Sequence, residues 1–138
     1  MEEFGSHIYV QTNAMARKVS TLADRHFRPY GWSMSYVLLL LAIHKRDGAG
    51  QKELSRVFHL APSTLTRFVD KLNNGGLVER IREGKEIMLE LTEGGRELVG
   101  ELEKEMERFD RELEKLWGVK YQDTLSRMLE FGIRQMDE

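Results

Sequence analysis

The sequence contains no cysteine among its 138 residues. Without a thiol the chain cannot form a disulfide, bind a metal through thiolate, or use cysteine as a nucleophile or redox switch. Long apolar runs are also absent, because the longest, VLLLLAI, covers only residues 37–43, whereas a bilayer span needs roughly 20 apolar residues. The chain begins Met-Glu-Glu, which is acidic where a signal peptide is basic. We therefore expect a cytoplasmic protein.

Motifs of common enzyme classes are missing as well. The sequence has no Gly-x-Ser-x-Gly, no glycine-rich phosphate-binding loop and no His-Glu-x-x-His. No histidine pair has the i, i+4 spacing of a helical metal site, and Asp24 and His26, two residues apart, point to different faces of a helix. We expect no catalytic residues, no metal site and no cofactor.

The composition is that of a folded protein. Apolar residues make up 41% of the chain and charged residues 32%, and the length suits one domain over residues 1–138. The net charge of −2 is unevenly distributed, because residues 92–138 hold eight Lys or Arg against thirteen Asp or Glu. A polyanion is therefore expected to approach the other end of the chain.

The first part of the sequence predicts three helices. Apolar residues at helical spacing predict a helix over about residues 5–30, which Pro29 helps to end. Ser33 is expected to cap a second, buried helix that ends at Asp47-Gly48. A short helix is expected over residues 51–58, with three inward-facing side chains, those of Leu54, Val57 and Phe58.

A fourth helix is expected to begin at Pro62, because the missing N–H of proline has no partner at the first helical position. Its apolar side chains recur at i, i+3, i+4 and i+7 and form a buried stripe of Leu65, Phe68, Val69 and Leu72. The opposite face is polar and carries Ser63, Thr64, Thr66, Arg67, Asp70 and Lys71. The run Asn73-Asn74-Gly75-Gly76 ends the helix.

From residue 77 the apolar residues alternate, which predicts a β-hairpin with a tight turn at Glu83-Gly84-Lys85. Thr92 is expected to cap a long helix of about 25 residues, roughly 37 Å in length. Gly118 ends this helix, and a last helix is expected to reach about residue 137. The predicted fold class is mainly α with a small β-hairpin wing.

Two short helices joined by a three-residue turn and followed by a hairpin are the parts of a winged helix-turn-helix, expected here over about residues 33–91. The second helix of such a unit enters the DNA major groove, where small hydroxyls permit close approach and Arg67 can bind guanine bidentately or hold a phosphate. We therefore predict binding of double-stranded DNA. The candidate DNA-binding residues are Gln51, Lys52, Pro62, Ser63, Thr64, Thr66, Arg67, Lys71, Arg82 and Lys85.

The series YGWSMSYVLLLLAI, QKELSRVFHLAPSTLTRFVDKLNNGGLVER and LTEGGREL resembles the MarR family of transcriptional regulators over nearly the whole chain. The resemblance implies an obligate homodimer, with dimerisation helices over about residues 5–30 and 93–137 interleaved. It also implies that two winged domains read a pseudo-palindromic operator. The expected function is that of a sequence-specific, double-stranded DNA-binding transcriptional regulator.

The wing departs from the family pattern. Members usually carry a longer wing with an Asp-x-Arg element, whose Asp pairs with the arginine that matches Arg80, and that element is absent here. We expect Arg80 to pair with Glu83 or Glu86 instead, and these carboxylates to repel the DNA backbone beside Arg82 and Lys85. Ala61 at the expected N-cap is a second departure, because a polar cap would be favoured there by roughly 1 kcal/mol.

In this family a cleft between the dimerisation helices and the winged domain binds small, often aromatic, anions. A matching effector pocket is expected from an aromatic group of His26, Phe27, Tyr30, Trp32 and Tyr36. The alternative is that these side chains are core and interface aromatics. A second alternative concerns function, since the short acidic wing also suits a winged-helix protein-interaction module that has lost specific DNA binding.

Overall fold

The computed structural model describes residues 1–137. The chain divides into two compact units, Met1–Glu105 and Met106–Glu138. Helix α5, which spans Glu93–Trp117, runs through the boundary. Each unit is therefore described by itself, the first with the winged helix-turn-helix and the second with the end of α5 and the last helix.

The first unit begins with a short 3-10 helix, Glu2–Ser6, and helix α1, Ile8–Phe27. The ring Nδ1 of His7 accepts a hydrogen bond from the Tyr9 N–H at 3.1 Å and caps α1. A second 3-10 turn over Arg28–Tyr30 ends in Gly31 at φ +78°, a left-handed conformation that glycine adopts without strain. The predicted first helix is confirmed, with 3-10 turns at both ends.

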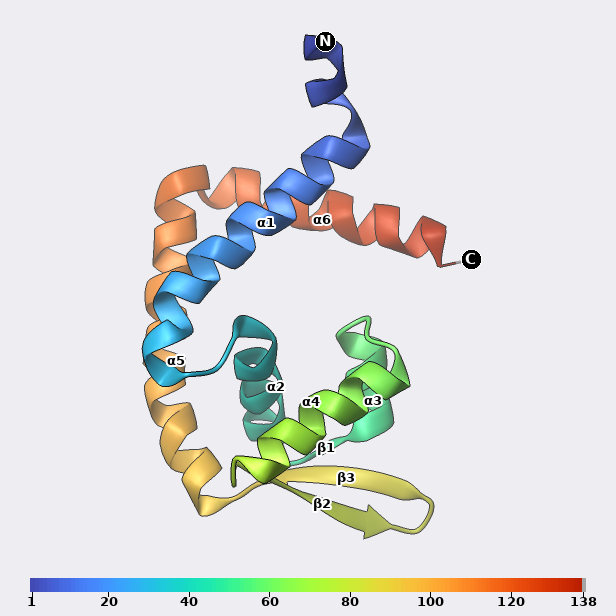
Figure 1. Ribbon diagram of the computed structural model, residues 1–138, viewed down its shortest axis with the longest axis vertical. Coiled ribbons are helices and arrows are strands. Elements are labelled where there is room, and N and C mark those ends of the chain that lie inside the picture. Colours follow the sequence, from blue (N-terminus) through green and yellow to red (C-terminus); the bar gives the residue numbers. More distant parts are fainter. Residues whose placement is uncertain (138) are drawn as a thin grey trace. The chain divides into compact units, whose positions relative to one another are not determined.

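Helices α2 (Met34–Lys45), α3 (Gln51–Val57) and α4 (Pro62–Asn74) follow as predicted (Figure 1). Ser33 occupies the N-cap of α2 in extended conformation but makes no side-chain capping bond. The largest fully buried side chains come from α1, α2, α4, the sheet and α5, and they are Phe27, Leu39, Leu40, Ile43, Leu65, Leu72, Leu89 and Leu102. The helix-turn-helix is therefore built on one apolar core.

One inward-facing prediction for α3 is wrong. Val57 is 50% exposed, whereas Leu54 is buried and Phe58 is half-buried. The place next to Leu54 is taken by Ser55, whose hydroxyl donates to the Leu60 carbonyl oxygen at 2.6 Å. The buried polar side chain thus closes the turn between α3 and α4, and α3 is rotated away from the orientation that an apolar count suggests.

The predicted hairpin consists of β2 (Val78–Glu83) and β3 (Glu86–Leu91), and Figure 1 shows it projecting beyond α3 and α4. Gly84 in its turn has φ +62°. A third strand, β1 (Ala49–Gly50), was not predicted and pairs antiparallel with β3, giving the order β1-β3-β2. Through β1, the segment before α3 is hydrogen-bonded to the wing.

Thr92 caps α5, as predicted, because its hydroxyl accepts a hydrogen bond from the Gly95 N–H at 3.0 Å and donates one to the Gly76 carbonyl oxygen at 2.6 Å. Helix α5 has the expected 25 residues. A Cβ at Gly95 would stand 2.2 Å from the Leu77 carbonyl oxygen, a backbone atom that cannot turn aside. Glycine at position 95 therefore permits the start of α5 to lie against the residue before β2.

In the second unit, α6 (Val119–Met136) follows Gly118, which has φ +80°. Its exposed apolar side chains include Tyr121, Met128, Leu129 and Met136, which recur at i, i+7, i+8 and i+15 on one face. No residue of α6 is buried. Among residues 1–137, none of the helices combines the length and apolar character that crossing a membrane requires.

Candidate nucleic-acid interface

Helix α4 is fixed at both ends. At its N-terminal end the Ser55–Leu60 hydrogen bond closes the turn from α3, in which His59 adopts φ +53°. At its C-terminal end the Asn73 amide Nδ2 donates to the Val78 carbonyl oxygen at 2.9 Å and joins α4 to β2. The helix is thereby held between α3 and the wing, and its polar face is presented in one orientation.

The two faces of α4 follow the predicted pattern. Leu65, Val69 and Leu72 are buried and Phe68 is half-buried. On the opposite side Ser63, Thr66, Arg67, Asp70 and Lys71 are exposed, and Thr64 is half-buried. Within residues 1–137 the Arg67 guanidinium makes no hydrogen bond or ion pair, so it is available to a ligand.

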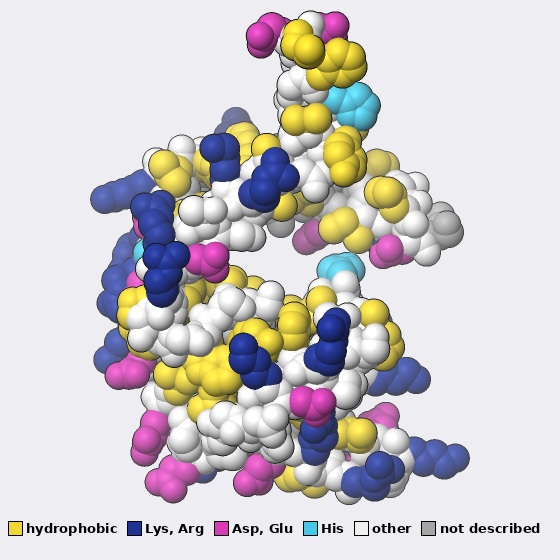
Figure 2. Space-filling view, in the orientation of Figure 1, with side chains coloured by type: hydrophobic (Ala, Val, Ile, Leu, Met, Phe, Trp, Pro, Cys, Tyr) yellow, Lys and Arg dark blue, Asp and Glu magenta, His cyan; other side chains and the backbone are white. Residues whose placement is uncertain are grey.

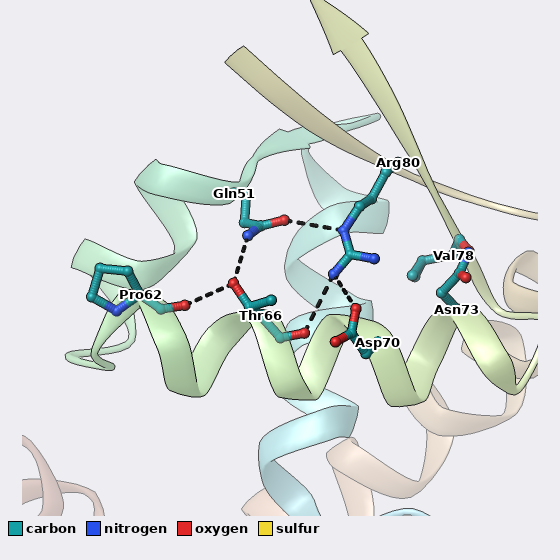
Figure 3. A network of polar contacts seen from close by, with 7 residues as sticks. All are labelled: Gln51, Pro62, Thr66, Asp70, Asn73, Val78 and Arg80. Carbon is teal, nitrogen blue, oxygen red and sulfur yellow. Dashed lines mark hydrogen bonds and ion pairs between the residues drawn. The ribbon is translucent and has the colours of Figure 1, made fainter. Parts of the chain in front are cut away.

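A polar network links α3, α4 and β2 (Figure 3). Arg80 Nη2 donates to Asp70 Oδ1 at 2.6 Å and to the Thr66 carbonyl oxygen at 3.3 Å, and Arg80 Nε donates to Gln51 Oε1 at 3.4 Å. The Gln51 amide donates to the Thr66 hydroxyl at 3.1 Å, and that hydroxyl donates to the Pro62 carbonyl oxygen at 2.9 Å. The guanidinium therefore meets groups from both helices.

This network corrects the prediction that Arg80 pairs with Glu83 or Glu86. Residues 80, 83 and 86 belong to the hairpin, but Glu83 and Glu86 lie opposite each other at its turn, while Arg80 lies opposite Leu89. Arg80 instead reaches across to Asp70 of α4, ten residues earlier. Sequence reasoning missed the pair because neither periodicity nor a local motif connects a helix residue to a strand residue.

Four of the predicted DNA-binding residues line one groove of about 700 Å³ between α3, the start of α4 and the wing. These are Gln51, Lys52, Pro62 and Lys85. Glu53 and Glu86 also line the groove, so its charge is mixed. Among the described residues that line the groove, the cationic groups are those of Lys52 and Lys85. The neutral Gln51 amide is already bonded to Arg80 and Thr66.

The wing carries both signs of charge. Arg82 on β2 faces solvent opposite Ile87, and Lys85 lies in the turn. Figure 2 shows Lys and Arg side chains over α4 and over the free end of the hairpin, with acidic side chains among them. The wing can therefore meet phosphates through Arg82 and Lys85, but Glu83 and Glu86 flank the same turn and weaken its attraction for a polyanion.

The start of α4 has no side-chain cap. Ala61 takes the N-cap position in extended conformation, as predicted, and makes no capping bond. The N–H groups of a first helical turn lack intrahelical partners and attract anions. This end of α4 is thus suited to a phosphate oxygen, next to the exposed hydroxyl of Ser63.

Lys71 differs from Arg67 in its surroundings. Its ammonium lies 5.9 Å from the centre of the Trp32 ring and 5.2 Å from that of Tyr36, within cation–π range. Tyr36 also packs on Phe68, with ring centres 4.8 Å apart. A long side chain held over two rings is less free to follow a DNA backbone than Arg67 is.

The five residues predicted to line an effector pocket fall into two groups. Trp32 and Tyr36 pack together beside Lys71, with ring centres 5.3 Å apart. His26, Phe27 and Tyr30 form the other group, in which Phe27 is fully buried. There His26 Nδ1 lies 2.7 Å from Glu105 Oε2, and the Tyr30 hydroxyl donates to Glu105 Oε1 at 3.5 Å.

Within residues 1–137 no three His, Asp or Glu side chains are arranged to hold a metal ion.

Glu105 was not among the predicted site residues. It lies in a run of alternating glutamates and basic residues that is typical of a solvated helix face, and its side chain is nevertheless only 14% exposed. Nothing local distinguishes it from its neighbours, and its pairing with α1 is a tertiary contact.

A family model described as the MarR family matches residues 32–84. Two curated relatives come from Bacillus subtilis (strain 168), both uncharacterized HTH-type transcriptional regulators. YwoH is 27% identical over 116 residues, which cover 82% of this chain and 84% of YwoH. YdgJ is 30% identical over 86 residues, which cover 60% of this chain. This match covers only about half of YdgJ's own length (52%).

Solved structures share the fold. A mutant MarR from E. coli, complexed with operator DNA, has a TM-score of 0.79 at 22% identity, covering 92% of this chain and 95% of that one. The transcriptional repressor CouR, bound to p-coumaroyl-CoA, has a TM-score of 0.85 at 22% identity, covering 97% and 96%. At this identity the likeness establishes the fold.

Proposed function

We propose that this chain is a MarR-type, sequence-specific transcriptional regulator that binds double-stranded DNA as a homodimer. The proposal is supported by the match of residues 32–84 to the MarR family model and by the similarity to YwoH. The observation that carries the proposal is the exposed polar face of α4. Ser63 and Arg67 are exposed there, on a helix fixed by α3 and the wing. We assign base contacts to Ser63, Thr64 and Arg67, and phosphate contacts to Lys52, Arg82 and Lys85.

The homodimer is supported by the apolar surface that each unit exposes. In the second unit the face of α6 with Tyr121, Met128, Leu129 and Met136 is unburied. In the first unit Phe4, Ile8 and Tyr9 are exposed near the N-terminus. Contiguous apolar faces of this kind mark interfaces, and a two-fold dimer would cover the same patches on both copies.

A two-fold dimer places two copies of α4 on one side of the duplex. Half-sites about one helical turn apart, roughly 34–36 Å, would then be read together, so the operator should be pseudo-palindromic. A neighbour of the same fold was crystallised with operator DNA, which supports DNA binding by this fold. Phosphate contacts would supply most of the affinity, and the Ser63, Thr64 and Arg67 side chains the sequence preference.

The experiment that tests the proposal is selection from a random duplex library with the purified protein, repeated at rising salt. We expect an enriched inverted repeat, because a symmetric dimer reads the same half-site twice. For about six to eight neutralised phosphates, the log–log salt slope should be near −0.9 per phosphate. A library that yields no enriched sequence at any salt contradicts the proposal.

One observation favours the rival function of a protein-interaction module. Glu83 and Glu86 lie opposite each other at the wing turn, where their carboxylates oppose the approach of a polyanion. A module of this kind would show no sequence preference, and its DNA binding would vanish at moderate salt. The same selection therefore separates the two functions.

The second part of the proposal is control by a small aromatic or anionic effector. The His26, Tyr30 and Glu105 side chains form a partly buried polar group beside Phe27, and CouR, similar in fold, was solved with an aromatic acyl-CoA. A ligand that favours one arrangement of the protein over another shifts its DNA affinity by the difference in binding free energy. We propose this group as the polar end of the effector site.

Simple phenolic acids and their CoA thioesters test the effector proposal. An effector should raise Tm by mass action and release the selected duplex at the same concentration. His26→Phe should lower the effector's potency while leaving duplex binding without the effector unchanged. If no compound of these two classes changes Tm or duplex affinity, this version of effector control is wrong.

A further inference from the structure

Asp70 is a negative group on the face that is proposed to bind DNA, and the inference that follows rests on that proposed function. Asp70 stands three residues after Arg67, so the two side chains lie on neighbouring turns of the same face of α4. Its side chain is 54% exposed. Duplex DNA carries one negative charge per roughly 1.7 Å of axis, so a bare carboxylate here opposes binding.

Arg80 counters this charge from outside the helix. Its guanidinium approaches the Asp70 carboxylate to 2.6 Å from β2, on the wing side of α4 (Figure 3). The Arg80 side chain is only 30% exposed, which is less than that of Asp70. The carboxylate is thus drawn toward the strand and neutralised at the surface where a phosphate would pass.

Other groups fix the guanidinium in that position. The Thr66 carbonyl oxygen accepts from Nη2, and the Gln51 amide oxygen accepts from Nε. Gln51 is itself held by the Thr66 hydroxyl. The planar fork of arginine meets acceptors in several directions, which a lysine ammonium on a flexible stem would not reproduce.

We propose that Arg80 is a positioning residue that masks the Asp70 carboxylate and so permits α4 to approach DNA. Gln51 and Thr66 then act by holding the guanidinium, and their role is to support the mask. Asp70 in turn keeps Arg80 at α4. The Arg80–Asp70 pair joins the wing to the recognition helix. MarR-family wings usually supply an aspartate that pairs with this arginine, and here Asp70 of α4 takes that role.

The alternative role for Arg80 is direct contact with phosphate. Its Nη1 group makes no hydrogen bond within residues 1–137, so that role is chemically open. The two roles differ in what happens when both members of the pair are neutral. A mask is no longer needed once Asp70 has lost its charge, whereas a phosphate contact is lost whatever residue 70 is.

A double-mutant cycle on the selected duplex makes this distinction. The four proteins are the parent, Arg80→Gln, Asp70→Asn and the double variant, and Kd, its salt dependence and Tm are measured for each. Because charge repulsion acts in both protomers, we expect Arg80→Gln to weaken binding at least about tenfold, and Asp70→Asn added to it to restore Kd to within about threefold of the parent. Asp70→Asn alone should bind within about threefold of the parent.

The contrary outcomes are distinct. If the double variant binds as weakly as Arg80→Gln while both keep the parent Tm, Arg80 contacts DNA itself and the inference is wrong. If the double variant binds weakly and melts well below the parent, the network is only a structural clamp, and the inference is again wrong. If the parent enriches no duplex, the proposed function fails before the cycle begins.

A variant that keeps the positive charge at position 80 provides a second comparison with Arg80→Gln. Arg80→Lys retains a cation near Asp70 but loses part of the hydrogen-bond network. If Arg80 masks Asp70, Arg80→Lys should bind the selected duplex with a Kd at least about threefold lower than that of Arg80→Gln at low salt. This difference in Kd should shrink as salt screens the charges. Equal Kd values for these two variants overturn the inference.

Discussion

Leu129→Lys is expected to convert the proposed homodimer to a monomer at micromolar concentration. Leu129 is 50% exposed and belongs to the apolar face of α6, so the substitution leaves the fold of one chain unchanged. In a two-fold interface each substitution occurs twice, and losing two buried leucines at about 2 kcal/mol each weakens association at least about a hundredfold. Sedimentation equilibrium, with circular dichroism to verify folding, measures the change.

Glu130→Gln is the matched control for Leu129→Lys, because it changes the net charge by the same amount from the adjacent position, away from the apolar face of α6. It should leave the dimer intact. Binding of the selected inverted repeat should be lost with the dimer, since a monomer reaches only one half-site. A dimer that survives Leu129→Lys would place the interface elsewhere, and the α6 face would then need another explanation.

The sequence alone predicted the helices and strands whose apolar residues recur at a regular spacing or that end at turn residues. The α4 stripe of Leu65, Val69 and Leu72 has the helical period, and the run after it contains turn residues. The hairpin alternates and turns at Gly84. Thr92 is a polar cap before a long helix, and it was found at its place because capping involves only neighbouring residues.

What the sequence did not predict depends on pairs that are distant along the chain. Strand β1 has two residues, too few for any period, and exists because Ala49 and Gly50 meet β3 about forty residues later. The Arg80–Asp70 pair joins a strand to a helix, and Glu105 meets His26 across 79 positions. Val57 was wrongly predicted to face inward for a related reason. Ser55 takes the inward position because its hydroxyl makes a hydrogen bond, which the spacing of apolar residues does not reveal.

The sequence also identified only some of the candidate DNA-binding residues correctly. Ser63 and Arg67 were identified by their place on an amphipathic helix, and the structure leaves both exposed. Gln51 was predicted to bind DNA, yet in the structure its amide group is hydrogen-bonded to Arg80 and Thr66. Helical phase therefore identifies which residues face outward, while tertiary contacts decide which of them remain available to DNA.

Arg67→Glu is expected to abolish specific DNA binding at no cost in stability. The Arg67 guanidinium is exposed and makes no ion pair within residues 1–137, so its replacement removes no intramolecular contact. Loss of a base or phosphate contact in each protomer, at about 1–3 kcal/mol, together with repulsion of the DNA, should weaken binding of the selected duplex at least about a hundredfold. Fluorescence anisotropy on the selected duplex and Tm measure the two effects.

Lys104→Glu reverses an exposed charge on α5 and is the control for net charge, so it should change Kd by no more than about threefold. Arg67→Lys then separates two roles. A phosphate contact tolerates a lysine and leaves the enriched sequence unchanged, whereas a bidentate guanine contact does not, and one position of the half-site becomes degenerate. Unchanged DNA binding by Arg67→Glu would contradict DNA recognition by α4 and favour the protein-interaction module. The other exposed cation of α4, all of whose residues the structure describes, is Lys71, and it is packed over aromatic rings.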